Sequence, residues 1–125
     1  MTIQDVDNFR KAATELSDRI KMFEKWLGEQ PARVLCSATE ASSKFCVRYA
    51  RSGKNWVLEF TDDGESWSLL RDASLDTKIR AVPLFKRLFS AMTKKREELA
   101  AALVDATAAF DSFAKEIKID PEAHK

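Results

Sequence analysis

Apolar residues in the first part of the chain recur at alternating steps of three and four positions. The residues on this spacing are Val6, Phe9, Ala13, Leu16, Ile20, Phe23 and Leu27. This is the a/d pattern of a helix that buries one narrow seam. Thr2 can cap such a helix at its start, and Gly28 follows its last apolar residue. The pattern predicts a helix that begins near Thr2 and ends at Leu27.

A different pattern, strict alternation of apolar and polar residues, runs from Lys44 to Arg71. It predicts an antiparallel meander of three strands, with turns at Ser52-Gly53 and Asp63-Gly64. These turns place Tyr49 opposite Trp56, and Leu58 opposite Leu69. Both predicted registers put the same eight apolar side chains on one face, namely Phe45, Val47, Tyr49, Trp56, Leu58, Phe60, Trp67 and Leu69.

The other face of the predicted sheet is polar or small, as expected for an antiparallel sheet that faces water on one side. The run from Arg33 to Ala38 predicts an additional edge strand, so the sheet has three or four strands. We expect the helices to cover the apolar face.

The last part of the chain predicts a long helix. After Ser74, a candidate cap, residues Leu75 to Val82 read as helical, and Pro83 either kinks this helix or opens a second one. An apolar stripe then continues, interrupted by Arg96, through Phe85, Phe89, Met92, Leu99, Leu103, Ala106, Phe110, Phe113 and Ile117. The fold class is therefore α+β, in a single domain of residues 1–125 with a frayed tail at residues 120–125.

The predicted helices are longer than the predicted strands of the sheet. Residues 83–117 as a helix span about 52 Å, and the first helix about 39 Å, whereas a seven-residue strand spans about 23 Å. The two helices would then form an arm beyond the sheet, and a second copy of the chain would cover its apolar side chains. The predicted interface consists of Val6, Phe9, Ala13, Leu103, Phe110 and Phe113. The alternative is a monomer in which the long helix folds back at Pro83.

The composition is that of a water-soluble globular protein: 45% of the 125 residues are hydrophobic and 33% are charged. Charge is unevenly distributed, because residues 44–96 hold twelve Lys/Arg against six Asp/Glu. A nucleic acid or an acidic protein could bind the basic residues of the first hairpin and the long helix. These residues are Lys44, Arg48, Arg51, Lys54, Lys86, Arg87, Lys94, Lys95 and Arg96. All aromatic residues of the meander are expected on the covered face, which argues against base stacking.

Residues suited to catalysis are scarce. The sole histidine, His124, lies next to the last residue, and Glu59 is expected to pair with Arg48 or a neighbouring lysine. The spacing of Cys36 and Cys46 fits neither a zinc site nor a redox motif, although the two could face each other across neighbouring strands. We expect no enzymatic activity, no metal and no cofactor.

The sequence has no basic lead followed by an apolar run, and no apolar stretch long enough to cross a membrane. A cytoplasmic location without membrane contact is the expectation. The leading interpretation is a non-catalytic protein–protein interaction or regulatory protein, homodimeric through the helical arm, with a further partner that the sequence does not identify. The alternatives are a nucleic-acid-binding regulator and, third, an enzyme or small-ligand binder with a pocket under the sheet edge.

Overall fold

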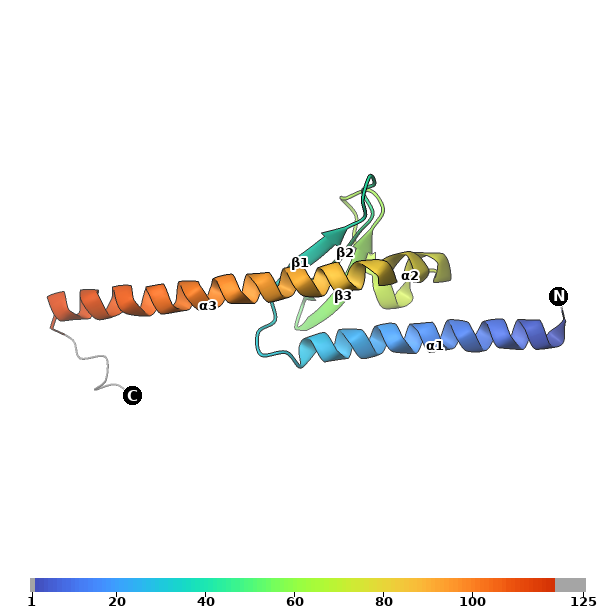
Figure 1. The fold of residues 1–125 in the computed structure, drawn as a ribbon, viewed down its shortest axis with the longest axis horizontal. Helices are drawn as coiled ribbons and strands as arrows, with labels where there is room; N and C mark the ends of the chain where they lie inside the picture. Colours follow the sequence, from blue (N-terminus) through green and yellow to red (C-terminus); the bar gives the residue numbers. More distant parts are fainter. Residues whose placement is uncertain (1, 119–125) are drawn as a thin grey trace. The chain divides into compact units, whose positions relative to one another are not determined.

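The computed structural model describes residues 2–118 (Figure 1). The chain divides into two compact units, one ending at Met92 and one beginning at Thr93. The predicted frayed tail at residues 120–125 lies outside the described residues.

The first helix, α1 (Ile3–Gly28), begins with a reciprocal cap. Thr2 Oγ1 accepts a hydrogen bond from the Asp5 N–H at 3.1 Å, and Asp5 Oδ2 accepts one from the Thr2 N–H at 3.2 Å. The two bonds satisfy donors that a helix start leaves free, so the predicted beginning is confirmed. The helix ends at Gly28, one residue later than predicted.

The sheet has four antiparallel strands in the order of the sequence, β1 (Cys36–Thr39), β2 (Cys46–Ser52), β3 (Asn55–Thr61) and β4 (Ser68–Leu69) (Figure 1). The predicted edge strand is confirmed as β1. The α+β class with both helices on one sheet face is confirmed as well, as the core described below shows.

The first hairpin differs from its predicted register by two residues. Its turn is Gly53-Lys54 rather than Ser52-Gly53, and Tyr49 pairs with Leu58 instead of Trp56. Gly53, with a φ of 61°, takes the first central position of the turn, where a two-residue hairpin loop favours glycine. A shift of two residues leaves every side chain on its predicted face, because side chains alternate with a period of two.

The second hairpin differs from its predicted register by one residue, and here the prediction was wrong. Leu69 pairs with Glu59, and Ser68 pairs with Phe60. Leu69 therefore lies on the face opposite to the one predicted, and alternation places Trp67 there too. The cause is a longer loop after Thr61, which replaces the expected two-residue turn.

The segment after the sheet consists of a 3₁₀ turn (Leu70–Asp72), the short helix α2 (Leu75–Ala81), a second 3₁₀ turn (Val82–Leu84) and the long helix α3 (Phe85–Glu116). The candidate cap before α2 is confirmed, because Ser74 Oγ accepts a hydrogen bond from the backbone N–H of the third helical residue at 3.3 Å. Pro83 occupies the second 3₁₀ turn, where its missing N–H does not interrupt either α-helix.

The hydrophobic core lies between one face of the sheet and the two long helices. The C-terminal half of α1 packs against the start of α3 (Figure 1), with ring centroids 4.5 Å apart for Phe23 and Phe85 and 5.4 Å apart for Trp26 and Phe89. The largest fully buried side chains of this core are Ile20, Leu27, Phe45, Val47, Tyr49, Leu58, Leu70, Leu88 and Met92. Among residues 2–118, no helix is both long enough and apolar enough to cross a membrane.

Candidate functional site

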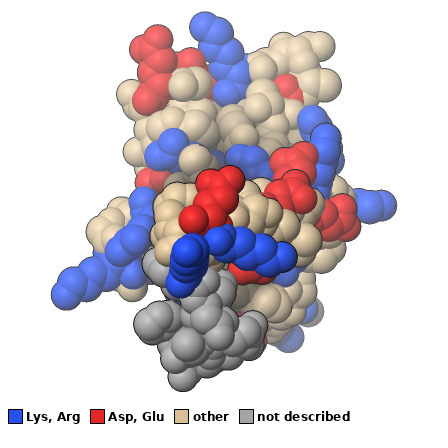
Figure 2. Space-filling model, turned by 90° about the vertical axis from the view of Figure 1, so that its left-hand side faces the viewer, with Lys and Arg blue, Asp and Glu red and all other residues tan. Residues whose placement is uncertain are grey.

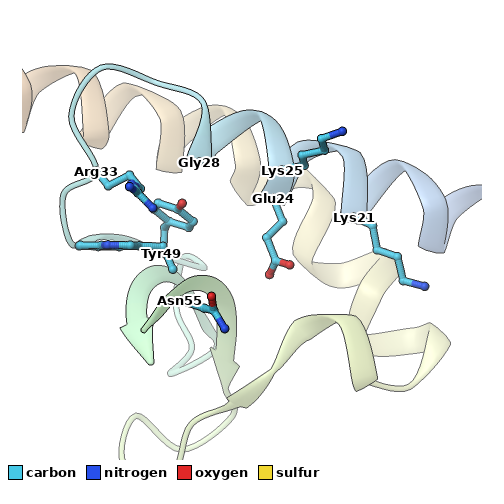
Figure 3. Close-up of a pocket in the computed structure, with 8 residues that line it drawn as sticks. Lys21, Glu24, Lys25, Gly28, Arg33, Tyr49 and Asn55 are labelled. Atoms are coloured by element: carbon cyan, nitrogen blue, oxygen red, sulfur yellow. The ribbon is translucent and has the colours of Figure 1, made fainter. Parts of the chain in front are cut away.

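A pocket opens between the C-terminal half of α1 and the turn end of the β2–β3 hairpin (Figure 3). Its volume is about 230 Å³. Helix α1 and the following loop contribute the charged side chains, and the hairpin contributes the aromatic ones. The lining residues are Lys21, Glu24, Lys25, Gly28, Arg33, Tyr49, Asn55 and Trp56.

Tyr49 is fully buried, and its hydroxyl has no hydrogen-bond partner among the residues that the structure describes. A Cβ placed on Gly28 would lie 3.6 Å from this hydroxyl, so the helix backbone approaches it closely. The Tyr49 ring lies against the Trp56 ring at a centroid distance of 5.4 Å. Burial raises the pKa of Tyr49, so the hydroxyl stays protonated and available as a donor.

Glu24, a second polar residue of the pocket wall, is hydrogen-bonded to the sheet. Its Oε2 accepts a hydrogen bond from the backbone N–H of Leu58 at 2.7 Å. Strand β4 ends before it can reach this N–H, because its last residue, Leu69, pairs with Glu59. The carboxylate of α1 therefore satisfies a donor on the edge of β3 that the sheet itself leaves open.

Three cations stand around the pocket, but they differ in orientation. Figure 3 shows the amino groups of Lys21 and Lys25 turned away from Tyr49, whereas the guanidinium of Arg33 lies beside its ring. The charge of Arg33 also acts on the Tyr49 hydroxyl, where it opposes the burial that raises the pKa. The pocket thus offers a buried neutral donor next to a guanidinium.

A second polar cluster lies on the open face of the sheet. Arg48 Nε and Glu59 Oε1 are 2.9 Å apart, which confirms the expected pairing of Glu59. The guanidinium carbon of Arg48 lies 3.8 Å from the centre of the Trp67 ring. The open face therefore does carry an aromatic residue, contrary to the sequence prediction, but Arg48 covers its ring.

The loop that carries Trp67 is held by one carboxylate. Asp63 Oδ1 accepts hydrogen bonds from the backbone N–H groups of Glu65 (2.8 Å) and Ser66 (2.9 Å) and from the Thr61 hydroxyl (2.9 Å). These donors lower the pKa of Asp63 to about 2, with the Ser66 N–H as the largest cause.

This pKa gives the loop a defined dependence on pH. An unfolded aspartate titrates near 3.9, so the hydrogen bonds of Asp63 stabilise the fold above that pH, and their contribution is lost as the pH falls toward 2. We expect the melting temperature of the wild type to fall more steeply between pH 5 and pH 2 than that of Asp63→Asn. Circular dichroism melts across this range test it; parallel curves for the two proteins would contradict it.

Some of the basic residues that were predicted to bind nucleic acid are engaged in contacts within the protein. Arg48 is engaged with Glu59 and Trp67, and Arg87 Nη1 donates to the Thr39 carbonyl at 2.8 Å. Alternation along β2 places Arg51 on the face opposite to Arg48. In the view of Figure 2, Lys and Arg side chains are interspersed with Asp and Glu.

The remaining members of this basic set are divided between the two units. Lys44, Lys54 and Lys86 are exposed and belong to the first unit, whereas Lys94, Lys95 and Arg96 belong to the second. Within the first unit, the predicted basic residues do not share one face of the sheet.

The residues proposed for a dimer interface are largely exposed. Phe9 is 62% exposed on α1, and Leu103, Phe110 and Phe113 on α3 are 60%, 50% and 51% exposed. Val6 is half-buried. On α1 and α2, an apolar groove of about 200 Å³ is lined by Phe9, Ala12, Ala13, Leu16, Leu75 and Ile79.

The two cysteines are separated by the sheet. Cys36 pairs with Tyr49, on the covered face, and Cys46 pairs with Thr39, on the open face. They form no disulfide, which answers the question that the sequence left open. In the described part of the chain, no three His, Cys, Asp or Glu side chains come close enough together to hold a metal ion.

The comparisons with known proteins give no relative. The sequence matches no protein-family model, and no curated protein or solved structure is significantly similar to it. Any functional statement therefore depends on the residues themselves.

The pocket at Tyr49 was not identified from the sequence beyond the general idea of a site under the sheet edge. One signal was present: Tyr49 is the only polar-tipped side chain other than tryptophan among the eight predicted to share the covered face. A hydroxyl on an apolar face needs a hydrogen-bond partner, so Tyr49 indicates a polar site on this face of the sheet.

Proposed function

We propose that this protein is a non-catalytic interaction protein that acts as a homodimer. Its interface is the part of α3 that belongs to the second unit, from Thr93 onward. The observation that carries the proposal is the exposed apolar stripe of this helix. Five large side chains on one heptad spacing, each between 44% and 60% exposed, make up the stripe: Leu99, Leu103, Phe110 and Phe113 in the helix, and Ile117 directly after its last residue. Exposed apolar stripes of this kind are typical of protein-binding surfaces.

The flanks of the stripe fit a close helix–helix contact. Small residues occupy three of the positions that flank the stripe on the helix surface, namely Ala100, Ala102 and Ala109. Without bulky charged side chains there, a second helix can approach until its own apolar residues interdigitate with the stripe.

The charges at the two ends of this helix favour a second copy in antiparallel orientation. Among the positions that flank the stripe directly, Lys95 is charged at one end and Glu116 at the other, whereas Glu97, Glu98 and Lys115 lie further round the helix. An antiparallel copy places Lys95 of one copy beside Glu116 of the other, and a parallel copy does not. Such charge complementarity selects both the partner and its orientation.

The test is the solution mass, measured by light scattering at micromolar concentration and at a tenfold dilution. Wild-type protein is expected at twice the 14.2 kDa of the chain. Leu103→Glu and Phe110→Glu should each give the monomer mass, because a dimer would bury an unpaired carboxylate. Val104→Glu is the matched control, since Val104 is 69% exposed but lies beside the stripe, and it should remain dimeric. A monomeric wild type at both concentrations would overturn the proposal.

Further variants test the orientation and extent of the interface. Lys95 precedes Arg96, which lies on the spacing of the stripe, and Glu116 precedes Ile117, so an antiparallel pair brings Lys95 and Glu116 together. Lys95→Glu and Glu116→Lys should each weaken the dimer, and the double variant should restore it. Phe9→Glu, measured in the same way, tests whether Val6, Phe9 and Ala13 belong to the interface, which remains a prediction.

A further inference from the structure

We infer that the pocket between α1 and the β2–β3 hairpin binds a small molecule through an acidic group, a carboxylate or a phosphate, which accepts a hydrogen bond from Tyr49 and pairs with Arg33. This inference is independent of the proposed dimer, because every lining residue precedes residue 57 and none belongs to the α3 stripe.

The first observation is the hydroxyl of Tyr49, which has no hydrogen-bond partner among residues 2–118. A phenylalanine would fill the same space in the core without leaving a buried polar atom unsatisfied, and such an atom destabilises a fold. The nearest carboxylate on the pocket wall, Glu24, is already bonded to the Leu58 N–H. The protonated hydroxyl is therefore a donor on a residue of the pocket wall, and among residues 2–118 it has no acceptor.

The charge around the pocket is the second observation, and it specifies the acceptor. Lys21, Lys25 and Arg33 stand against the single carboxylate of Glu24, so the wall is positive overall. Arg33 is the cation beside Tyr49 (Figure 3). A guanidinium presents paired N–H donors, which fit the oxygens of a carboxylate or phosphate.

The size and the remaining wall limit the rest of the ligand. A volume of about 230 Å³ is below the range of about 300–1,000 Å³ for sites that enclose drug-sized molecules. The half-buried Trp56 ring, packed on Tyr49, supplies an apolar surface, and the exposed Asn55 supplies an amide at the edge. The site therefore fits one acidic group attached to a short apolar or flat portion.

The experiment is a calorimetric titration of the full-length protein with inorganic phosphate and, separately, with acetate, at constant ionic strength. Saturable binding of at least one probe at concentrations on the order of 10 mM is expected for a single acidic group. The probe that binds more tightly distinguishes a phosphate site from a carboxylate site. No saturable heat from either probe would overturn the inference.

Three variants locate the binding. Tyr49→Phe removes only the hydroxyl, and Arg33→Gln removes the adjacent charge; each should weaken binding about tenfold or more. Lys44→Gln removes the same charge from an exposed side chain that does not line the pocket, and its affinity should stay within about threefold of the wild type. An equal loss in all three variants would show general charge attraction and would overturn the site.

Thermal unfolding of the ligand-free protein gives an independent readout. Tyr49→Phe is expected to melt at a higher temperature than the wild type, because it removes a buried hydroxyl without a partner. Saturating phosphate or acetate should raise the melting temperature of the wild type but not that of the variant. A lower melting temperature for ligand-free Tyr49→Phe would mean that the hydroxyl already has a partner, and would contradict the inference.

Discussion

Leu88→Ala is expected to lower the free energy of unfolding by about 2–5 kcal/mol, the usual cost of truncating a fully buried leucine. Leu88 is 0% exposed and lies in the first unit, where the start of α3 covers the sheet. Its removal takes apolar surface out of the core and leaves a cavity that the surrounding side chains fill only partly.

The same helix supplies the control for this prediction. Val104→Ala shortens a side chain that is 69% exposed and lies outside the apolar stripe, so the free energy of unfolding should stay within about 0.5 kcal/mol of the wild type. Urea unfolding curves followed by circular dichroism compare the variants. Equal, small effects at the two positions would show that the start of α3 does not pack on the sheet as described.

Glu24→Ala is expected to destabilise the fold by about 1.5–3 kcal/mol, because the deleted carboxylate accepts a charge-assisted hydrogen bond. Its partner is the N–H of Leu58, a residue that is 0% exposed in β3. Without Glu24, this donor stays buried and unsatisfied, since β4 ends before reaching it.

Glu24→Gln is the informative companion to this variant. The glutamine amide keeps an oxygen that can accept from the Leu58 N–H, so most of the stability should return. Hydrogen exchange at the Leu58 amide gives a local measurement: protection should drop strongly in Glu24→Ala and only slightly in Glu24→Gln. Unchanged protection in Glu24→Ala would show that another group satisfies this N–H.

The two hairpins show how far local sequence patterns determine a sheet. Alternation alone predicted which residues of β2 and β3 face the helices, and a register shift of two at Gly53 did not change that result. Alternation failed after Thr61, where Asp63 gathers three donors into a longer loop and moves Trp67 and Leu69 to the other face. Side-chain hydrogen bonds of this kind leave no trace in the hydrophobic pattern.

The candidate site depended on contacts between distant segments. The orphan N–H of Leu58 exists only because β4 is short, and Glu24 reaches it only because α1 lies over that edge. Tyr49 likewise meets Gly28 of α1 only in the folded chain, where its hydroxyl is buried without a hydrogen-bond partner among residues 2–118. Neither relation follows from spacing within one element.

The sequence by itself determined the helices, the N-terminal caps of α1 and α2, the strands and the apolar faces of β2 and β3, because each of these depends on the periodicity and chemistry of neighbouring residues. The heptad stripe of α3, the basis of the proposed dimer, was also readable without a structure. Only the tertiary structure decided the register of the second hairpin, the separation of the two cysteines and the pocket at Tyr49. These features depend on which donors, acceptors and volumes remain unsatisfied once segments far apart in the chain have packed together.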